Sequence, residues 1–284
     1  MTANDMHINF KLEADKTDSL NYPDFEPEEI DKWLNIAQER YIKQRYSGMN
    51  AHRASFEQTQ KRMDDLREVL TNAEIITFTT TGSNKPNGKF AALPTGAGQE
   101  YWLAINEEAE VVYMDCDTVA TVTGTIKSGE YYMVTSGSIV YDSVTYASGT
   151  YFIGGAPQNF TGTGIVKTAK AKRVKVKPKR HDEYNEFIRD PFNKPYEDEV
   201  LRLSFQSQVE LITDGTFVVS KYFLRYIRKA REILLDLLIP ANSVDCELAD
   251  ITHQEIVEQA VQLALESIES PRYQTIMMET GKQE

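Results

Sequence analysis

The strongest constraint on the fold is a change of hydrophobic period along the chain, from helical at both ends to strand-like in the middle. From about residue 73 to 180, Thr, Val, Tyr and Gly become frequent, and short apolar runs alternate with turn residues. Near the N-terminus, apolar residues recur at the spacing of one helix face, at Ile30, Trp33, Leu34, Ala37 and Tyr41. The sequence therefore predicts an α+β protein, in which a helical frame carries a β-rich inserted barrel or sandwich domain.

The boundaries of these patterns divide the chain into five expected segments. The first helix begins at Pro27, which suits a first helical turn, and ends at Ser47 and Gly48. A second helix is expected at about 55–70, with its charged residues, including Arg62 and Asp65, on the exposed side. The segments are an extended N-terminal arm (1–26), a helical hairpin (27–72), a β-rich domain (73–180), a mixed α/β part that closes the helical frame (181–271) and a tail (272–284).

The last helix carries the clearest local signal. Thr252 and Glu255 have the spacing of a capping box, in which each side chain satisfies a free N–H group at the helix start. Ile251 and Ile256 have the spacing of the hydrophobic contact that accompanies such a box. We therefore expect a helix that begins near Thr252 and ends before Pro271.

Charge and cysteine content exclude several classes of protein. The net charge is −12, so the chain as a whole lacks the basic footprint of a nucleic-acid binder. Cys116 and Cys246 are too few and too far apart for a disulfide framework or a zinc site, which fits a reducing compartment. The longest apolar run, 233–239, is interrupted by Asp236 and is too short to span a bilayer. Residues 1–10 do not resemble a signal peptide, so we expect a soluble protein made in the cytoplasm, with no membrane contact.

No residue pattern indicates catalysis, a cofactor or a metal. The segment from Gly82 to Lys89 superficially resembles a phosphate-binding loop, but its glycines are too far apart and Phe90 stands where a Ser or Thr is needed. Asn87-Gly88 is better explained as a β-hairpin turn. The four histidines are scattered along the chain. We expect no enzyme, although a pair of glycosidase carboxylates would carry no fixed spacing.

One local feature runs against the acidic balance of the chain. Between Ile165 and His181 there are eight basic residues and no acidic one. The alternation in 173–177 predicts a strand with one buried and one basic face. This basic strip is either a solubilising edge strand or a surface that meets phosphates or an acidic partner. It comprises Lys167, Lys170, Lys172, Arg173, Lys175, Lys177, Lys179 and Arg180.

Several runs of residues together resemble a known family, and they lie at 27–46, 56–67, 190–195, 226–229 and 253–261. They look like structural proteins of tailed bacteriophages related to the crAss-like phages, and are most similar to ring proteins of the head–tail connector, or neck. The resemblance covers about 27–72 and 181–275 and leaves out the β-rich middle.

The resemblance implies a non-enzymatic virion protein at the head–tail junction. Such adaptors assemble as homo-oligomeric rings, often dodecameric, that contact the portal and other neck or tail rings and make transient, non-specific contact with DNA in their channel. The net negative charge outside the basic strip would suit a channel that does not bind DNA tightly. The basic strip would contact a neighbouring subunit or face the DNA. The implied portal-docking helix and tail include Ile256, Val257, Ala260, Arg272 and Tyr273.

Three alternatives remain at the level of sequence. One is another tail-ring or tail-hub protein whose β domain binds a tail partner or a glycan. A glycan hydrolase is the second, and it would need a cleft with close carboxylates. The third is a DNA-associated protein that uses the basic strip.

Overall fold

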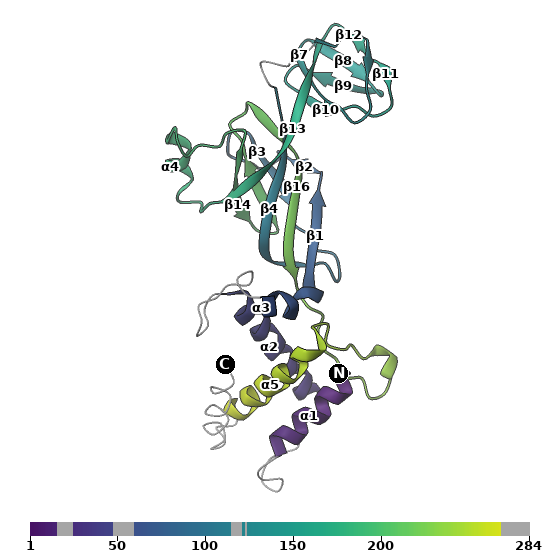
Figure 1. Cartoon of the computed structure of the whole chain (residues 1–284), viewed down its shortest axis with the longest axis vertical. Helices are drawn as coiled ribbons and strands as arrows, with labels where there is room; N and C mark the ends of the chain where they lie inside the picture. The colour runs from purple at the N-terminus through teal and green to yellow at the C-terminus, as the bar shows by residue number, and fades with distance from the viewer. Residues whose placement is uncertain (16–24, 48–59, 115–120, 123, 268–284) are drawn as a thin grey trace. The chain divides into compact units, whose positions relative to one another are not determined.

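The computed structural model describes residues 1–15, 25–47, 60–114, 121–122 and 124–267. The chain forms two compact units, each described by itself below (Figure 1). A helical unit comprises 1–71, 96–102 and 227–284, and a β unit comprises 72–95 and 103–226. The predicted α+β class is confirmed.

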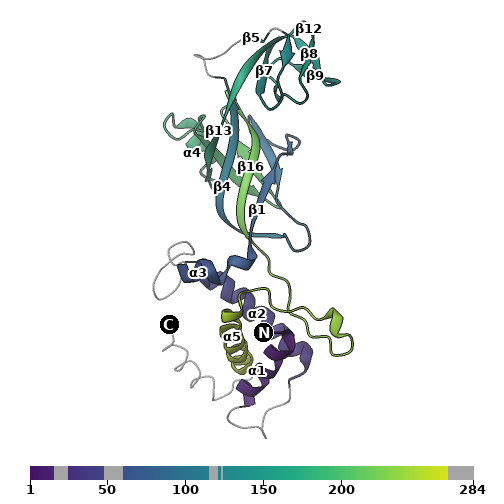
Figure 2. The ribbon, with the colours of Figure 1, turned by 45° about the vertical axis from the view of Figure 1, so that its right-hand side comes forward.

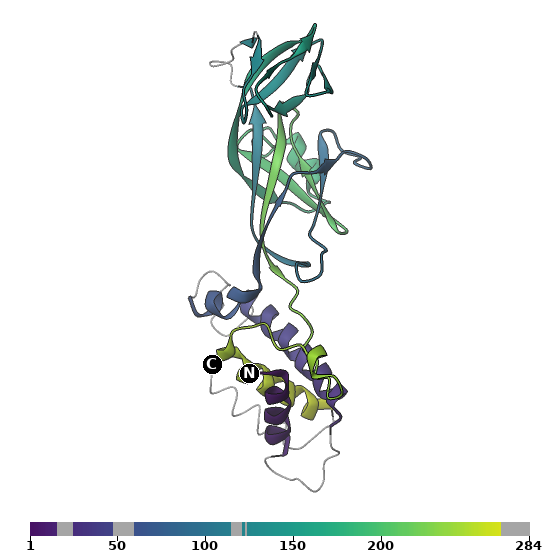
Figure 3. The same ribbon diagram turned by 90° about the vertical axis from the view of Figure 1, so that its right-hand side faces the viewer.

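The helical unit is built on three helices: α1 (Ala3–Asp15), α2 (Pro27–Tyr46) and α5 (His253–Ser267). Helix α5 packs against both α1 and α2, as Figure 3 shows. The smaller elements are α3 (Gln60–Asp65) and the 3-10 turns η2 (Arg67–Val69), η3 (Pro240–Asn242) and η4 (Asp250–Thr252).

Helix α2 begins and ends where the sequence predicts. Pro27 occupies its first turn, and Glu26 and Glu29 form a reciprocal capping box that satisfies free N–H groups. Ile30, Leu34 and Tyr41 of the expected stripe are fully buried. The second expected helix lies partly outside the described residues, and its described part is the short α3.

The predicted extended arm is wrong for residues 3–15, which form α1. Thr2 and Asp5 cap this helix reciprocally, because the side chain of each accepts a hydrogen bond from the backbone N–H of the other. Met6 and Phe10 are fully buried on one face of the helix. The stripe was missed because it is short and set among polar residues, although Thr2-x-x-Asp5 was a readable start signal.

The expected capping box of α5 does not form. The Thr252 hydroxyl donates instead to the Ala249 carbonyl at 2.7 Å, which closes the turn η4 ahead of the helix. Glu255 pairs with Arg45 and Lys61, and Ile251 is 71% exposed, so the expected hydrophobic contact is also absent. The extent of the helix was nevertheless predicted correctly, because the period of its apolar residues is independent of the cap.

The β unit is organised around a curled sheet with the strand order β1-β16-β4-β13-β14-β15-β3-β2. Strands β13 and β14 are parallel, with Lys175 opposite Glu199, and the helix α4 (Tyr184–Arg189) lies in their connection. The strands are β1 (Leu70–Ile75), β2 (Phe78–Thr79), β3 (Gly88–Ala92), β4 (Tyr101–Tyr113), β13 (Ile165–Pro178), β14 (Glu199–Phe205), β15 (Gln208–Ile212) and β16 (Phe217–Arg228).

This sheet extends beyond residue 180, where we expected the β-rich domain to end. Strands β14 and β15, which we assigned to the part that closes the helical frame, belong to the same sheet as the strands before residue 180. Strand β16 lies between β1 and β4, far from its neighbours in sequence. Pairing over such distances leaves no local signal, so hydrophobic pattern alone could not assign these strands to a domain.

A second β cluster lies at the N-terminal end of β13, where residues 165–169 pair with β7 (Figure 2). Its core contains Tyr132, Val134, Phe152 and Val166, and the rings of Tyr132, Tyr141 and Tyr146 pack on Phe152. Its short strands are β5 (Thr121–Val122), β6 (Thr125–Ile126), β7 (Tyr131–Ser136), β8 (Ser138–Tyr141), β9 (Val144–Ala147), β10 (Tyr151–Ile153), β11 (Gln158–Asn159) and β12 (Thr161–Gly162).

The hairpin predicted at Asn87-Gly88 is confirmed. Phe78 of β2 lies opposite Ala91 of β3, and Asn87 adopts a positive φ of 59°. A β-carbon at position 88 would come within 2.8 Å of the Glu210 carboxylate, so a larger residue there would force that side chain to move. The segment that resembled a phosphate-binding loop is therefore a hairpin turn.

No helix in the described part of the chain is long and apolar enough to cross a membrane.

Truncating a buried side chain of α2 should lower the stability of the helical unit. Leu34 is fully buried, so Leu34→Ala is expected to lower the free energy of unfolding by about 2–5 kcal/mol. The matched control is Leu12→Ala on α1, where the side chain is 60% exposed and the expected change is within about 0.5 kcal/mol. Urea unfolding followed by tryptophan fluorescence measures both, because Trp33 and Trp102 belong to the helical unit. Equal effects of the two variants would contradict the assigned packing.

Candidate interaction surfaces

The basic strip lies on β13 and the residues that follow it. Val174 and Val176 are buried while Arg173 and Lys175 are exposed, as the alternating pattern predicts. In the sheet order β13 lies between β4 and β14, but residues 170–175 pair with β4 and residues 175–178 pair with β14, so the two partners overlap only at Lys175. On these pairings most of the basic strip has one neighbouring strand, and the explanation of these lysines as blockers of a free edge stays a prediction.

Acidic side chains of the same chain meet much of the strip. The Lys172 ammonium lies 2.6 Å from the Asp198 carboxylate, and the Lys177 ammonium lies 2.9 Å from Glu199. Burial alone would lower the pKa of Lys172, but the hydrogen bond and charge of Asp198 outweigh it and raise that pKa. Arg180 pairs with Asp182 at 2.9 Å, and Arg173 lies 3.9 Å from Glu108.

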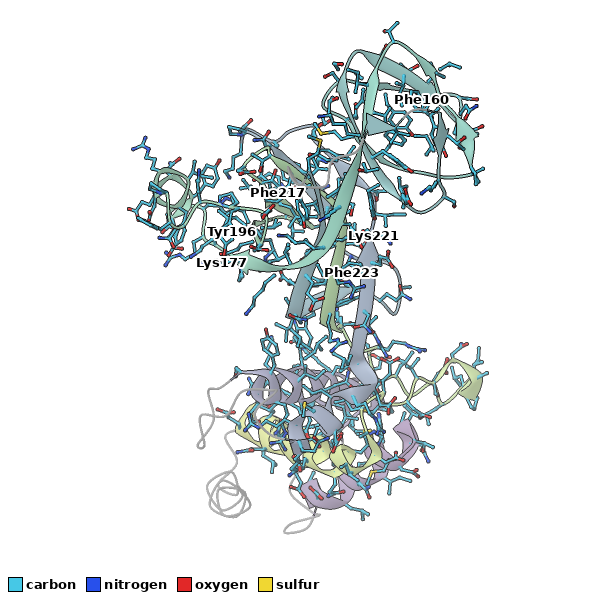
Figure 4. All side chains as sticks on the ribbon, turned by 45° about the horizontal axis from the view of Figure 1, so that its top comes forward. Phe160, Lys177, Tyr196, Phe217, Lys221 and Phe223 are labelled. Atoms are coloured by element: carbon cyan, nitrogen blue, oxygen red, sulfur yellow. The ribbon has the colours of Figure 1, made fainter. Side chains whose placement is uncertain are left out.

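Aromatic rings cover further parts of the strip's positive charge. The Arg173 guanidinium lies 4.1 Å from the ring centre of Phe223, and the Lys172 ammonium lies 4.6 Å from that of Tyr113. Figure 4 shows Phe223 on β16, and Lys177 and Tyr196 at the side of the sheet that carries α4. The structure thus gives Lys172, Arg173, Lys177 and Arg180 acidic or aromatic partners within the chain, which reduces the charge available to DNA.

The candidate docking face of α5 is buried. Ile256, Val257 and Ala260 are fully covered in the helical unit, where α5 packs on α1 and α2. These three residues therefore cannot contact the portal in this conformation, and that expectation is corrected. Arg272 and Tyr273 lie outside the described residues. An apolar helix stripe does not by itself distinguish a partner protein from the chain's own helices.

A buried charge cluster joins α2, α3 and α5, and no pattern in the sequence had indicated it. Arg45 Nε lies 3.2 Å from the Asp65 carboxylate, and the Arg45 guanidinium also pairs with Glu255. The Tyr41 hydroxyl donates to Asp65 at 3.2 Å, and burial raises the pKa of both Tyr41 and Asp65. Asp65 was expected on the exposed side of a longer helix. Its burial was missed because the partner Arg45 is distant in sequence.

A further surface comes from the apolar run 233–239, which is too short to span a bilayer. Helix α2 holds the start of this run by its polar side chains. The Asn35 amide exchanges two hydrogen bonds with the Ile233 backbone, at 2.9 and 2.7 Å, and Leu235 N–H donates to Asp31 at 3.2 Å. Beyond this anchor, residues Leu234–Ile239 form what we call the apolar loop, which projects from the helical unit (Figure 1).

Comparisons with known proteins agree with the resemblance drawn from the sequence. A family model described as "Phage tail ring protein 3/4" matches residues 158–275. A protein described as "Ring protein 3", from Bacteroides phage crAss001, is 39% identical over 84 residues, which make up 27% of this chain and 36% of that protein. The matched chain thus covers just over a third of the length of this relative.

The resemblance to ring proteins of crAss-like phages is confirmed, and the comparisons support a structural ring protein of a phage particle. The family match begins within the β-rich region and includes β13, which the sequence resemblance had left out. Residues 27–72, which the sequence resemblance included, lie outside the family match.

Removing the arginine of the buried charge cluster should be costly. Arg45→Ala leaves Asp65 buried without its partner, so the free energy of unfolding is expected to fall by about 3–5 kcal/mol. Lys61→Ala removes the exposed partner of the same Glu255 and should cost about 0–1 kcal/mol. Urea unfolding at pH 7 compares the two. A loss below 1 kcal/mol for Arg45→Ala would contradict the buried pair.

Cys246 should be almost inert in the folded protein. Burial raises the pKa of its thiol to about 11, so its thiolate fraction at pH 8 is roughly a hundredfold below that of a free cysteine. In a Cys116→Ser variant, Ellman's reagent at pH 8 is expected to react slowly with the native protein and at once after denaturation in urea. The rate should rise with pH up to about 11, because only the thiolate attacks. A fast native reaction at pH 8 would contradict this burial.

Proposed function

We propose that this chain is the subunit of a closed homo-oligomeric ring, dodecameric by analogy with portal-proximal adaptors, at the head–tail connector of a tailed phage. There it would contact the portal and neighbouring rings and surround the passage of the genome. The observation that carries the proposal is the family match, which spans β13 to α5 and so includes parts of both compact units. A structural role for the chain follows from that family and not from any catalytic geometry.

The charge distribution supports a passage that does not hold DNA tightly. The chain carries a net charge of −12, and the most basic segment is met by acidic and aromatic side chains of its own chain. Counterion release drives DNA binding only where cations are free to approach phosphates. Contact with the genome would then be transient and non-specific.

The proposed portal contact has to be reassigned within the C-terminal region. Since Ile256, Val257 and Ala260 are buried, we propose that residues after Ser267 make this contact, among them Arg272 and Tyr273. The alternative function is that of a ring or hub farther along the tail. It differs from this proposal in where the chain lies in the phage particle. The test is therefore one of location.

Gold labelling tests the position directly. A His-tagged copy of the chain, incorporated in phage particles and decorated with nickel–nanogold, should place the label at the junction of head and tail in electron micrographs. Untagged particles are the control for stray gold. Label at the far end of the tail would favour the tail-hub alternative, and label along the tail would favour a different tail ring.

The basic strip should contribute little to DNA affinity. Replacing Lys172, Arg173, Lys175 and Lys177 by Gln is expected to change the affinity for duplex DNA by less than threefold, because acidic or aromatic partners already engage three of them. Fluorescence anisotropy over a salt series measures the affinity. A genuine site with four phosphate contacts would instead lose much of its affinity, and the slope of log K against log salt would fall by about 3.6.

A further inference from the structure

The apolar loop exposes three consecutive large aliphatic side chains. Leu237 is 64% exposed, Leu238 is 93% exposed and Ile239 is 54% exposed. Scattered apolar residues on a surface are ordinary, but a contiguous projecting group marks a site of interaction. The helical unit thus carries a convex apolar feature that its own core does not use.

Hydrogen bonds fix the shape of this loop. The Asp236 carboxylate accepts from the N–H groups of Leu238 and Ile239 at 2.9 and 2.8 Å. Leu234 and Val244 pair across its base, and Asp236 N–H donates to the Ser243 hydroxyl at 3.0 Å. A loop already held in one conformation loses little entropy when it binds, which favours its use as an interface.

The same unit carries a pocket with a partly apolar lining. A pocket of about 430 Å³ opens beside α2, and its apolar lining comes from Ile36, Ile42, Trp102 and Ala230. The lining also includes charged groups of both signs, among them Lys32 and Glu39. Protein interfaces likewise combine apolar and polar groups.

The positions of the two features suit repeated association. The loop is anchored at Asp31 and Asn35 of α2, and the lining of the pocket begins at Lys32 and Asn35 and extends along the helix to Ile42. A closed ring requires two different surfaces on every subunit, one of which fits the other on the next copy. The projecting loop and the pocket beside α2 are two different surfaces of one subunit and provide such a pair.

We infer that the apolar loop of one subunit inserts Leu237, Leu238 and Ile239 into the α2 pocket of the next copy of this chain, as the core of the ring contact. This inference rests on the proposed ring function and adds the identity of the contacting surfaces. Since stable interfaces bury on the order of 1,000 Å² or more in total, the loop would be the centre of a larger contact.

Site-directed crosslinking in phage particles tests the contact. The full chain carries Cys116→Ser, Leu238→Cys and Ile36→Cys, while buried Cys246 is kept as it is. A short bismaleimide applied to purified particles should give a ladder of covalent oligomers longer than the dimer on denaturing gels. Leu237→Cys in place of Leu238→Cys is the second loop variant, and both loop positions are exposed enough to leave the fold intact.

The control pairs Ile36→Cys with Phe192→Cys, because Phe192 is an equally exposed apolar residue in the β unit. This pair should give no ladder. A third variant adds Asp236→Ala to the Leu238→Cys and Ile36→Cys pair, which removes the hydrogen bonds that shape the loop, and should lower the ladder yield severalfold.

The outcomes separate this inference from the proposed function. Copy number in the same particles is measured by mass spectrometry. A ring copy number without a ladder, a ladder that stops at the dimer, or an equal ladder from the Phe192→Cys control would overturn the loop–pocket contact alone. Absence of the chain from the particles would overturn both proposals.

Discussion

The β unit depends on the pairing of one strand, β13. Its first half pairs with β5 and β7, and its second half pairs with β4 and β14. Val166 belongs to the core of the small β cluster, whereas Val174 and Val176 are buried in the main sheet. A strand of this kind must keep a regular alternation over its whole length, because a slip of one residue would turn its apolar side chains outward at both ends.

The same constraint explains the basic strip without reference to DNA. One face of β13 is buried beside its neighbours, so the other must be polar, and long lysine and arginine side chains suit it. The residues that meet them, Glu199 opposite Lys175 and Glu108 opposite the same residue on the other neighbour, come from the strands that flank β13. Opposite charges across neighbouring strands favour this register over alternatives.

The helical unit is specified in a different way, by polar side chains that hold irregular backbone. Asp31, Asn35 and Gln38 on one side of α2 bind the backbone of Arg231, Ile233 and Leu235, while Leu234 between them pairs with Val244. Buried backbone groups need such partners, and the helix supplies them. The apolar loop projects from this anchor, so its exposure is a fixed property of the fold.

The sequence alone predicted the features that depend on the local spacing of hydrophobic and turn residues. The α+β class, the bounds of α2, the extent of α5 and the Asn87-Gly88 hairpin all follow from spacing and turn chemistry within a few residues. It failed where contacts join distant segments: β16 enters between β1 and β4, Arg45 meets Asp65, and the face with Ile256 packs inside the unit. Helix α1 was missed for a smaller reason, because its buried stripe is short. The ring resemblance came from particular runs of residues, and its C-terminal part is confirmed.

If the chain forms a ring in the phage particle, each particle must contain it in the copy number of a ring. Quantitative mass spectrometry of purified particles, with isotope-labelled peptides of this chain and of the portal protein, gives the ratio of the two. We expect a ratio near one, as for two rings of equal symmetry, or another small-integer ratio. Absence from the particle, or a copy number well below that of a ring, would contradict it.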